Sequence, residues 1–510
     1  MIMEICRSLC LHCRHERIGE LPNEDVCAGI QDQLAISRLS RCSNRLRVTA
    51  QPILFHFFAY LEARVAARRW EAQVAIQKRE AAFIRTLFWR PDLASSVRSL
   101  VLWSPTEDWW GEARKSFALE DQDQTFKRIA KRLGPQWEGR QYDKPFEFHE
   151  LAIALAPRAS YVMLNCYFGL NLSVPSPSQT WENWPQRLEN LKHLVLVDRE
   201  ISSDYCYLRD FMALIKHTPN LESLVVESLV VAGCHDGDRD NWEDLWSSSD
   251  EFLSRLKKLS VRGFMRGPYR TFIPCSVVEV MIRHSPVLED LEFFHPWEPI
   301  HLHGKSDLER FDLDVYLGTA KTTLKRLCYS AFCFGRVRIY WRGEDEEDLD
   351  VFYPNADTRP QFTTGMSLHD FTALEALELE QPVLYGQVFD NPDRSRELLS
   401  ISEFLGKLPP LLKHFRLGFV FSWPIVFRDL MALADEHGTR FPQLRSVTLD
   451  LNERPQQKEH DILLQTYQLA GISLTMQYTV WGGRGLLPTR PAGYPAPKPT
   501  PISYEEETRV

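Results

Sequence analysis

Long hydrophobic runs are absent from this 510-residue sequence. A membrane-spanning helix needs roughly 18 apolar residues in succession, and the most apolar stretch, 224–232, is broken by Glu227 and Ser228. Charged residues among the first twenty also interrupt every apolar run before it reaches the length of a signal peptide. We therefore expect an intracellular protein that has no membrane partner and resides in the cytoplasm, the nucleus or both.

The sequence also lacks a basic excess. It carries 60 Lys and Arg against 69 Asp and Glu, a formal net charge of −9. A protein held on nucleic acid by phosphate contacts needs an excess of positive charge, so we expect no nucleic-acid partner. Residues 1–100 hold 15 of the basic and 10 of the acidic residues. The acidic excess therefore belongs to the larger remainder, whose field favours basic partners.

The eleven cysteines, an odd number scattered mostly one by one, do not match a disulfide framework. A reducing compartment is the simpler interpretation. The exception is the N-terminal group Cys6-x3-Cys10-x2-Cys13, with His12 and His15 beside it. This spacing could hold zinc, and it also matches the three-cysteine spacing of iron–sulfur clusters in radical enzymes. Because the group lies on a short charged segment, we favour unligated reduced thiols and expect neither a metal nor a cofactor.

Catalytic fingerprints are scarce for a chain of this length. The sequence holds no Gly-x-Ser-x-Gly, His-Glu-x-x-His or Gly-x-Gly-x-x-Gly motif. Gly304-Lys-Ser306 ends like a phosphate loop, but Pro299 stands where the first glycine is needed. His301 and His303 would share one face of a strand without an evident third metal ligand. We therefore expect no enzymatic activity and no catalytic residue.

What the sequence does hold is a recurring phrase: an apolar residue, two variable residues, a second apolar residue, one variable residue and a third apolar residue. The clearest copies begin at Leu191, Leu221, Leu256, Leu288 and Leu374, and weaker ones begin at Leu324, Leu412 and Leu444. Successive copies lie 30 to 50 residues apart. This spacing is typical of a stack of structural repeats.

Each copy predicts one strand that follows one helix. The second and third apolar positions lie two apart, so they point to the same face of an extended chain. Apolar residues at helical spacing come before the phrase, as in 208–215 and 277–281, and a proline then follows at Pro219 and Pro286. Because one unit cannot cover its own apolar faces, neighbouring units must stack and bury a continuous core.

The phrase Leu-x-x-Leu-x-Leu resembles the leucine-rich repeat. The Asn or Cys that usually follows the third leucine is missing, and several units carry polar insertions, so we expect an irregular solenoid over residues 93–481. Upstream, residues 61–92 are rich in Ala, Arg, Glu and Gln and predict a linking or capping helix. Residues 1–19 are expected to form a disordered tail, and the proline-rich residues 482–510 another.

Residues 20–60 have the character of a small helical module. Leu21-Pro-Asn-Glu24 is followed by apolar residues at helical spacing, then by Leu39-Ser-Arg-Cys-Ser-Asn-Arg-Leu46-Arg and Ala50-Gln-Pro-Ile-Leu54. This order resembles the F-box motif in the form common among fungal proteins. Taken together, the two resemblances imply an α/β fold class: an N-terminal helical F-box-like module followed by an irregular leucine-rich-repeat-like solenoid.

The F-box resemblance implies docking on Skp1 and, through it, on a cullin, within an SCF-type E3 ubiquitin ligase. Carried onto this chain, the implied Skp1-binding residues are Leu21, Pro22, Ile30, Leu34, Leu39 and Leu46. The stretch from Glu24 to Leu39 is about two residues shorter than in the motif, which rotates part of the docking face. An alternative is therefore an interaction scaffold whose F-box-like segment does not dock on Skp1.

In a solenoid, the polar residues between and after the inward apolar positions of each strand face the concave surface, where such arrays bind partners. We expect the substrate-binding residues at Lys258, Arg262, Asp290, Glu292, Phe294, Glu378, Glu380, His414 and Arg416. Patches of both signs lie beside each other in this set, which favours recognition of a mixed-charge protein surface. The expected function is thus a non-catalytic adaptor that recruits a substrate protein for ubiquitination.

Overall fold

We analysed a computed structural model of the chain. The structure describes residues 2–10, 13, 35–59, 70–103, 119–134, 145–165, 188–197, 209–227, 253–262, 264–266, 269–271, 275–294, 317–330, 367–385, 401–420, 423–451 and 455–478. All structural statements below concern these residues. Among them, no helix combines the length and the hydropathy that crossing a membrane requires.

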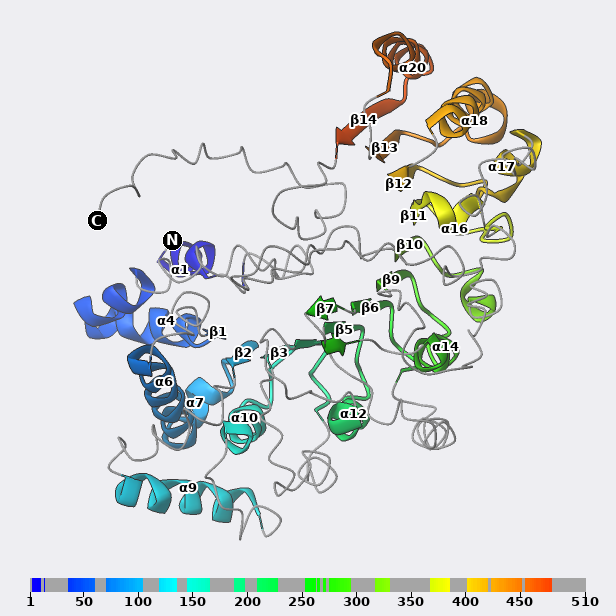
Figure 1. Ribbon diagram of the computed structural model, residues 1–510. Coiled ribbons are helices and arrows are strands. Elements are labelled where there is room, and N and C mark those ends of the chain that lie inside the picture. The colour runs from blue at the N-terminus through cyan, green and yellow to red at the C-terminus, as the bar shows by residue number, and fades with distance from the viewer. Residues whose placement is uncertain are drawn as a thin grey trace, which may run out of the picture.

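One parallel sheet runs through the whole described chain (Figure 1). Its twelve strands stand side by side in sequence order, and every pair of neighbours is parallel. They are β1 (Phe57–Ala59), β2 (Ser99–Trp103), β3 (Tyr161–Asn165), β4 (His193–Val197), β5 (Ser223–Glu227), β6 (Lys258–Arg262), β9 (Asp290–Phe294), β10 (Arg326–Ser330), β11 (Ala376–Glu380), β12 (His414–Val420), β13 (Ser446–Leu451) and β14 (Ser473–Tyr478). β1 and β14 form the two edges. A separate antiparallel pair joins β7 (Phe264–Arg266) to β8 (Tyr269–Thr271).

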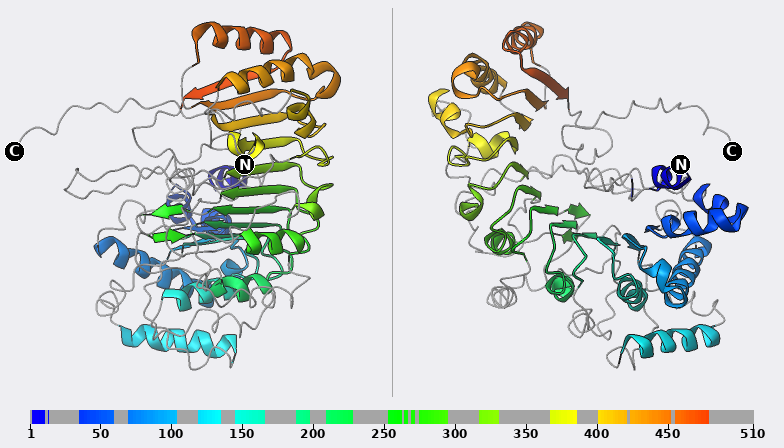
Figure 2. Two further views of the ribbon diagram at one scale, coloured as in Figure 1. Left: turned by 45° about the vertical axis from the view of Figure 1, so that its right-hand side comes forward. Right: turned by 180° about the vertical axis from the view of Figure 1, so that it is seen from behind.

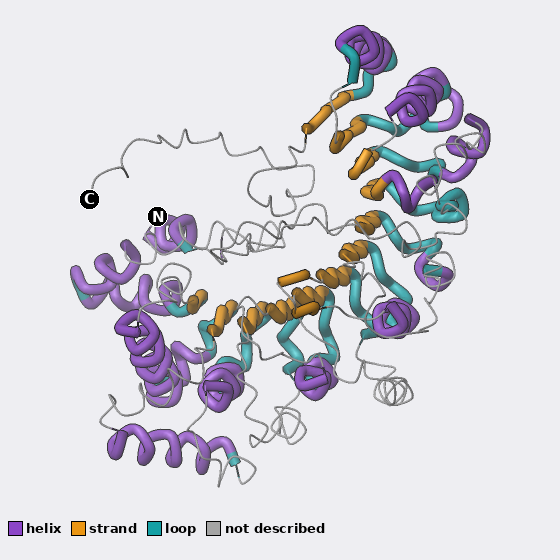
Figure 3. The backbone as a smooth tube through the Cα atoms, viewed as in Figure 1, coloured by secondary structure: helices purple, strands orange, loops and turns teal. Residues whose placement is uncertain are grey.

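Helices line one side of this sheet. The strands follow an arc, the helices from α6 onward lie on its outer side, and the opposite face of the strands looks into the arc (Figures 1 and 3). We call that opposite face the inner face. The helices are α1 (Ile2–Leu9), α4 (Asn44–Leu54), α6 (Trp70–Trp89), α7 (Pro91–Ala94), α9 (Leu119–Leu133), α10 (Pro145–Ala154), α12 (Arg209–Lys216), α14 (Cys275–Arg283), the 3-10 helix η2 (Gly318–Ala320), α16 (Gln381–Tyr385), α17 (Ile401–Lys407), α18 (Trp423–Asp435), α19 (His437–Arg440) and α20 (Gln457–Leu469).

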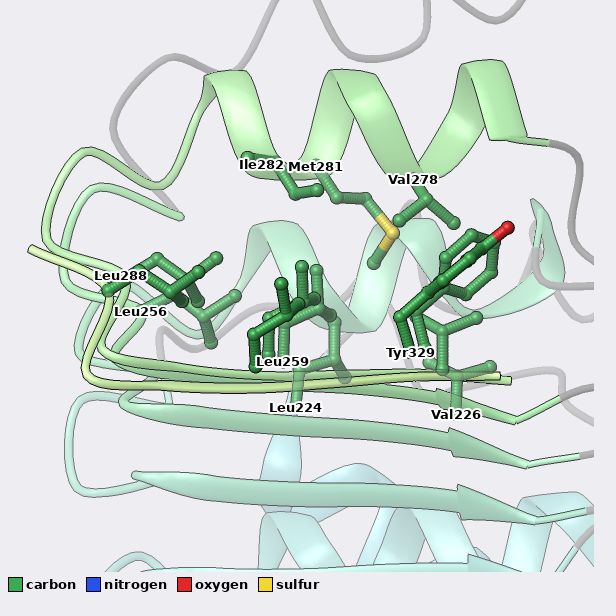
Figure 4. Packing of buried hydrophobic residues seen from close by; sticks show 14 of the residues in the cluster. Leu224, Val226, Leu256, Leu259, Val278, Met281, Ile282, Leu288 and Tyr329 are labelled. Carbon is green, nitrogen blue, oxygen red and sulfur yellow. The ribbon is translucent and has the colours of Figure 1, made fainter. Parts of the chain in front are cut away.

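The core fills the space between the sheet and the outer helices. Leu259 and Val261 of β6 are buried, as are the corresponding residues of the neighbouring strands, because alternate side chains of a strand point to the same face. Val278 and Met281 of α14 point down onto these strands (Figure 4). Burying one leucine contributes about 2–3 kcal/mol, so the repeated phrase supplies the main stabilisation of each unit.

Each unit is joined to the next before its strand begins. The N–H of Lys257 donates to the carbonyl of Glu222, and the N–H of Glu289 donates to the carbonyl of Lys257. The same bond recurs from unit to unit up to the N–H of Arg445, which donates to the carbonyl of Lys413. These bonds satisfy backbone N–H and carbonyl groups of the turns before the strands. They extend the contact between the stacked strands that Figure 2 shows.

The strands and helices predicted by the recurring phrase are confirmed. The five clearest copies form β4, β5, β6, β9 and β11, and the three weaker ones form β10, β12 and β13. The expected helix over 208–215 corresponds to α12, and that over 277–281 corresponds to α14. Proline ends these helices as expected, since Pro219 and Pro286 lie between helix and strand.

The predicted fold class, an F-box-like helical module followed by a leucine-rich-repeat-like solenoid, is wrong. The finding that overturns it is the single twelve-stranded parallel sheet, because its edge strand β1 comes from residues expected inside the helical module. Phe57 and Ala59 pair with Ser99 and Val101 of β2, so the N-terminal region continues the sheet instead of preceding it. Parallel pairing requires a long connection between partners, and here α6 supplies it.

Residues 2–10 and 35–54 lie at the β1 end of the sheet, opposite α20 (Figure 1). α1 packs against α4, and residues 35–42 are also helical. Ser43 caps the start of α4, because its hydroxyl accepts a hydrogen bond from the N–H of Leu46. A small core of Cys6, Cys10, Ile36, Ala50 and Ile53 holds these segments together.

Candidate functional site

The inner face of β6 and the strands after it carries charged residues in register. Lys258, Asp290 and Arg326 occupy one row across β6, β9 and β10. Ser260, Glu292, Cys328, Glu378 and Arg416 occupy a second row, two residues further along each strand. Because these positions alternate with the buried apolar residues, the sheet points them all away from the core. We call this set, together with Glu227, Arg262, Ser330, Glu380 and Asp450, the inner-face network.

Glu292 receives three hydrogen bonds within the network. Its carboxylate accepts hydrogen bonds from Arg262 Nη2 at 2.8 and 3.0 Å and from Ser260 Oγ at 3.0 Å. Arg262 also lies 3.8 Å from Glu227 on β5, and its guanidinium stands over the ring of Phe294, 5.9 Å from the centroid. One arginine thus links three neighbouring strands through charge and an aromatic face.

Two further groups repeat this pattern. Asp290 accepts a hydrogen bond from Arg326 Nη1 at 2.7 Å, and the ammonium of Lys258 approaches it to 3.7 Å. On the later strands, Arg416 lies 3.3 Å from Glu378 and donates two hydrogen bonds to Asp450, at 2.9 and 3.1 Å.

Between these groups, the hydroxyl of Ser330 donates to the carboxylate of Glu380. The charged groups therefore form a chain of pairs from β5 to β13.

Burial and neighbouring charges set the ionisation of this face. Burial alone would raise the pKa of Glu292, but Arg262 and Arg326 and the hydrogen bonds from Arg262 and Ser260 hold it below its usual value. Glu292 is therefore ionised at neutral pH. Burial, together with Glu378 and Glu292, raises the pKa of the Cys328 thiol well above its usual value, so this thiol stays protonated and is a poor nucleophile.

His414 lies at the start of β12, where its Nδ1 is 2.8 Å from the hydroxyl of Ser446. Burial and the charges of Arg445 and Lys413 lower the pKa of this imidazole, which keeps it neutral at pH 7. A neutral imidazole beside a serine hydroxyl offers a hydrogen-bonding pair for a ligand. The nearby carboxylates are held by arginines, so this face offers ion pairs and hydrogen bonds.

The earlier strands present a different inner face. Phe57, Val101, Met163 and Val197 are buried and form a small apolar cluster across β1 to β4. Tyr161 and Val195 pack against it. The inner face therefore divides into an apolar part on β1 to β4 and a charged part from β5 onward.

The nine residues predicted to bind substrate all lie on the charged part of the inner face. Lys258 and Arg262 come from β6, Asp290, Glu292 and Phe294 from β9, Glu378 and Glu380 from β11, and His414 and Arg416 from β12. The sheet brings them together because the strands stand in register.

Sequence reasoning missed Arg326, Glu227 and Asp450, which complete the ion pairs, and Ser330, which donates a hydrogen bond to Glu380. Arg326 occupies the same place in its phrase as Lys258 and Asp290 do in theirs, so that position could have identified it.

The residues predicted to bind Skp1 fall mostly outside the described part of the chain: Leu21, Pro22, Ile30 and Leu34 belong to residues for which no structure is given. Leu39 is partly buried and packs against the small core formed with α1. Leu46 is partly buried in α4. Two residues further on, Val48 is 77% exposed, so α4 presents one large apolar side chain to solvent.

Away from the inner face, the described residues offer one group of thiol and imidazole side chains that could hold a metal ion: Cys10, Cys13 and His56. It lies beside α1 and the end of α4. No protein-family model matches this sequence, and no curated protein matches it either. The interpretation of both sites therefore rests on their geometry and on the residues themselves.

Proposed function

We propose that this chain is a non-catalytic protein-binding adaptor whose inner face recognises a segment of mixed charge on a substrate protein. The observation that carries this proposal is the inner-face network, in which acidic and basic side chains lie beside one another and alternate in sign from Lys258 through Asp290 to Arg326 across β6, β9 and β10. Arg326 and Asp290 keep about a fifth to a quarter of their side chains exposed, 22% and 25%. A partner can therefore reach the outer edge of these groups while their internal bonds remain.

The pattern of the network defines the partner. A segment that carries only one sign of charge would meet a like charge in the row of Lys258, Asp290 and Arg326, which costs binding energy. A segment with alternating acidic and basic residues would find an opposite charge at each of these three positions. Phe294, beside Arg262, supplies an aromatic surface for an apolar side chain of the same segment.

The proposal assigns the other end of the chain to the ubiquitin ligase. The resemblance of residues 21–54 to the F-box motif supports docking on Skp1 and, through it, on a cullin in an SCF-type E3 complex. The exposed side chain of Val48 on α4 adds an apolar contact of the kind that such docking uses. The adaptor would act in the cytoplasm or the nucleus, which agrees with a cysteine spacing that does not match a disulfide framework.

Co-purification of the full chain with Skp1 tests this assignment. We expect wild type to bind Skp1 and the double variant Leu21→Ala/Pro22→Ala to lose binding. Leu469→Ala is the matched control, because Leu469 is 82% exposed on α20 at the far end of the sheet and should leave binding unchanged. A folded wild type that does not bind Skp1 contradicts the ligase assignment.

A second experiment tests the inner face separately. Selection from a random peptide display library should yield mixed-charge peptides that bind wild type. Arg326→Gln should remove the preference for an acidic residue at one position, since it deletes a positive charge of the network. The adjacent change Lys325→Gln is the matched control, because Lys325 lies just before β10 and outside the network. Identical selection by both variants would contradict a binding role for this face.

One observation favours an alternative in which the chain is an interaction scaffold that does not dock on Skp1. Leu39, a predicted docking residue, already packs inside the molecule. Phe57 and Phe58, just after α4, are held in the sheet. In this alternative the N-terminal region only completes the sheet. The Skp1 experiment separates the two candidates, because the scaffold would pass the peptide selection and fail the co-purification.

A further inference from the structure

Three potential metal ligands meet where the N-terminal helix contacts the end of α4. Cys10 follows α1 directly, and Cys13 comes three residues later. His56 follows α4 and precedes β1, 43 residues along the chain. The sulfur and nitrogen donor atoms of these three residues all lie within 4.8 Å of one another. Segments remote in sequence thus bring two thiols and an imidazole to one point.

The distances suit a small tetrahedral ion. Cys13 Sγ lies 3.3 Å from His56 Nδ1. In a tetrahedral zinc site with Zn–S of about 2.3 Å and Zn–N of about 2.1 Å, neighbouring donors stand roughly 3.5–3.8 Å apart. The three donors therefore surround a point from which each can reach an ion after movements of less than about 1 Å.

The backbone of His56 is held in place by hydrogen bonds. The carbonyl of His56 accepts hydrogen bonds from the N–H groups of Arg98 and Ser99, both at 2.9 Å, which fixes this residue to the start of β2. Cys10 is buried in the small core with Cys6, Ile36, Ala50 and Ile53, and its thiol lies 3.8 Å from the carbonyl of Ile53. A ligand set that the fold already orients binds an ion with little loss of conformational entropy.

We propose that Cys10, Cys13 and His56 bind one zinc ion that fastens the N-terminal helix to the edge of the sheet. Two thiolates and one imidazole are soft and intermediate donors, the set that selects zinc over magnesium or calcium. The fourth position belongs to water or to a further protein donor. His12 and His15 are nearby in sequence but lie outside the described residues.

This site differs from what the cysteine spacing suggested. The sequence group offered Cys6, Cys10 and Cys13 with His12 and His15 and was expected to remain unligated. The structure supplies His56 instead, which no local spacing could indicate. Cys6 is buried in the same small core but does not belong to the group of three, so its role is packing.

Titration with Co²⁺ tests the proposal, since this ion reports tetrahedral thiolate ligation by its absorption. The full chain is purified under reducing conditions, stripped with a chelator and titrated. We expect one equivalent of Co²⁺ to bind with thiolate charge-transfer bands, and Zn²⁺ to displace it. Hydrogen exchange of the α1 amides should become slower when Zn²⁺ is bound.

Variants separate ligation from folding. His56→Cys keeps a donor and should retain binding, whereas His56→Leu should weaken it by at least about tenfold. Cys10→Ser and Cys13→Ser should each weaken the charge-transfer bands, and the double variant should abolish them. Cys42→Ser, an exposed position, and Cys6→Ser, a buried position outside the group, are matched controls that should bind as wild type does.

Two results would overturn the site. The first is a reduced full chain that shows no charge-transfer bands with excess Co²⁺. The second is equal binding by His56→Leu and His56→Cys, because both variants keep the two cysteines and differ only in the third donor. The proposal is independent of Skp1 and of the inner face, so neither binding experiment affects it.

Discussion

Two series of charged residues run across the same strands, and they differ in their access to water. The first lies immediately before the strands and consists of Lys192, Glu222, Lys257, Glu289, Lys325, Glu375, Lys413 and Arg445. We call it the rim ladder. The second is the inner-face network. The side chain of Lys325 in the rim ladder is 55% exposed, whereas that of Glu292 in the network is 9% exposed.

The rim ladder shows how charge can favour one order of neighbouring strands at little energetic cost. Basic and acidic residues alternate along most of its length, so Glu222 meets Lys192 at 2.7 Å and Lys257 at 3.3 Å. Hydrogen bonds from these lysines lower the pKa of Glu222, against a smaller opposing effect of burial. Water and salt screen such pairs, so each one adds little stability. A strand that paired with the next strand but one would, however, place like charges side by side, such as Lys192 beside Lys257.

The inner-face network is different because its most buried charges, those of Glu292 and Asp450, have largely left water. Each buried ion pays a desolvation cost that only its partner offsets, so removing one partner leaves the other uncompensated. Opposite charges on neighbouring strands can thus change the free energy of unfolding by a large or a negligible amount. Burial decides which, and the following changes test this comparison from the largest expected effect to the smallest.

Arg416→Met should give the largest loss of stability. It leaves Asp450, whose side chain is 5% exposed, without its two hydrogen bonds from the guanidinium. We expect the free energy of unfolding to fall by about 3 kcal/mol, measured by urea denaturation. The double variant Arg416→Met/Asp450→Leu should recover part of this loss, since it removes the stranded carboxylate. A loss below about 1 kcal/mol would show that this buried pair contributes no more to stability than a surface ion pair does.

Glu292→Gln should have a smaller effect that depends on pH. The pKa of Glu292 is lower in the folded protein than its ordinary value of 4.5. Its stabilisation is therefore fully present above about pH 4.5 and is lost as the pH falls through the folded-state pKa. At pH 7 we expect the variant to be about 1–2 kcal/mol less stable than wild type.

The measurement for this variant is the urea midpoint across the pH range. Wild type and Glu292→Gln should converge as the pH falls from about 4.5 through the lower folded-state pKa, because only below that pKa do both carry a neutral side chain. Asp370→Asn is a suitable control, since Asp370 is largely exposed and lies 3.8 Å from Lys321. A constant difference between wild type and Glu292→Gln at all pH values would show that the charge of Glu292 is not the cause.

Much of the repeated unit could be predicted from the sequence, for a physical reason. The phrase around Leu256, Leu259 and Val261 fixes which side chains must be buried, and burial at alternate positions requires a strand. The helices before these strands follow from apolar spacing and from a proline that ends them. The inner-face residues were then predicted as the positions left between the buried ones.

The fold class could not be predicted, because its deciding contact is remote and short. β1 is three residues long, contains no recurring phrase, and pairs with β2 across an intervening helix. The group of Cys10, Cys13 and His56, for which we propose metal binding, was missed for the same reason, since 43 residues separate Cys13 from His56. Arg262 was predicted as a substrate-binding residue, but not as the ion-pair partner of Glu292.

Asp290→Asn should have an intermediate effect. The side chains of Asp290 and Arg326 are partly exposed, so water can compensate Arg326 when the carboxylate is lost. We expect a decrease of about 1 kcal/mol in the free energy of unfolding, between those of a buried and an exposed pair. Urea denaturation at low and high salt checks this value. An effect as large as that of Arg416→Met would show that exposure does not rank these pairs.

Changes at Lys325 should have the smallest effect. Lys325 bonds Glu289 at 2.8 Å in the rim ladder, with both side chains in contact with water. Lys325→Gln should therefore leave the urea midpoint unchanged within error. Lys325→Glu would place a third acidic group between Glu289 and Glu375, so it should lower the midpoint slightly. About 1 M salt should remove that decrease, because the screening length then falls to about 3 Å. A large loss that salt does not reverse would mean that the rim ladder stabilises the sheet as the buried network does.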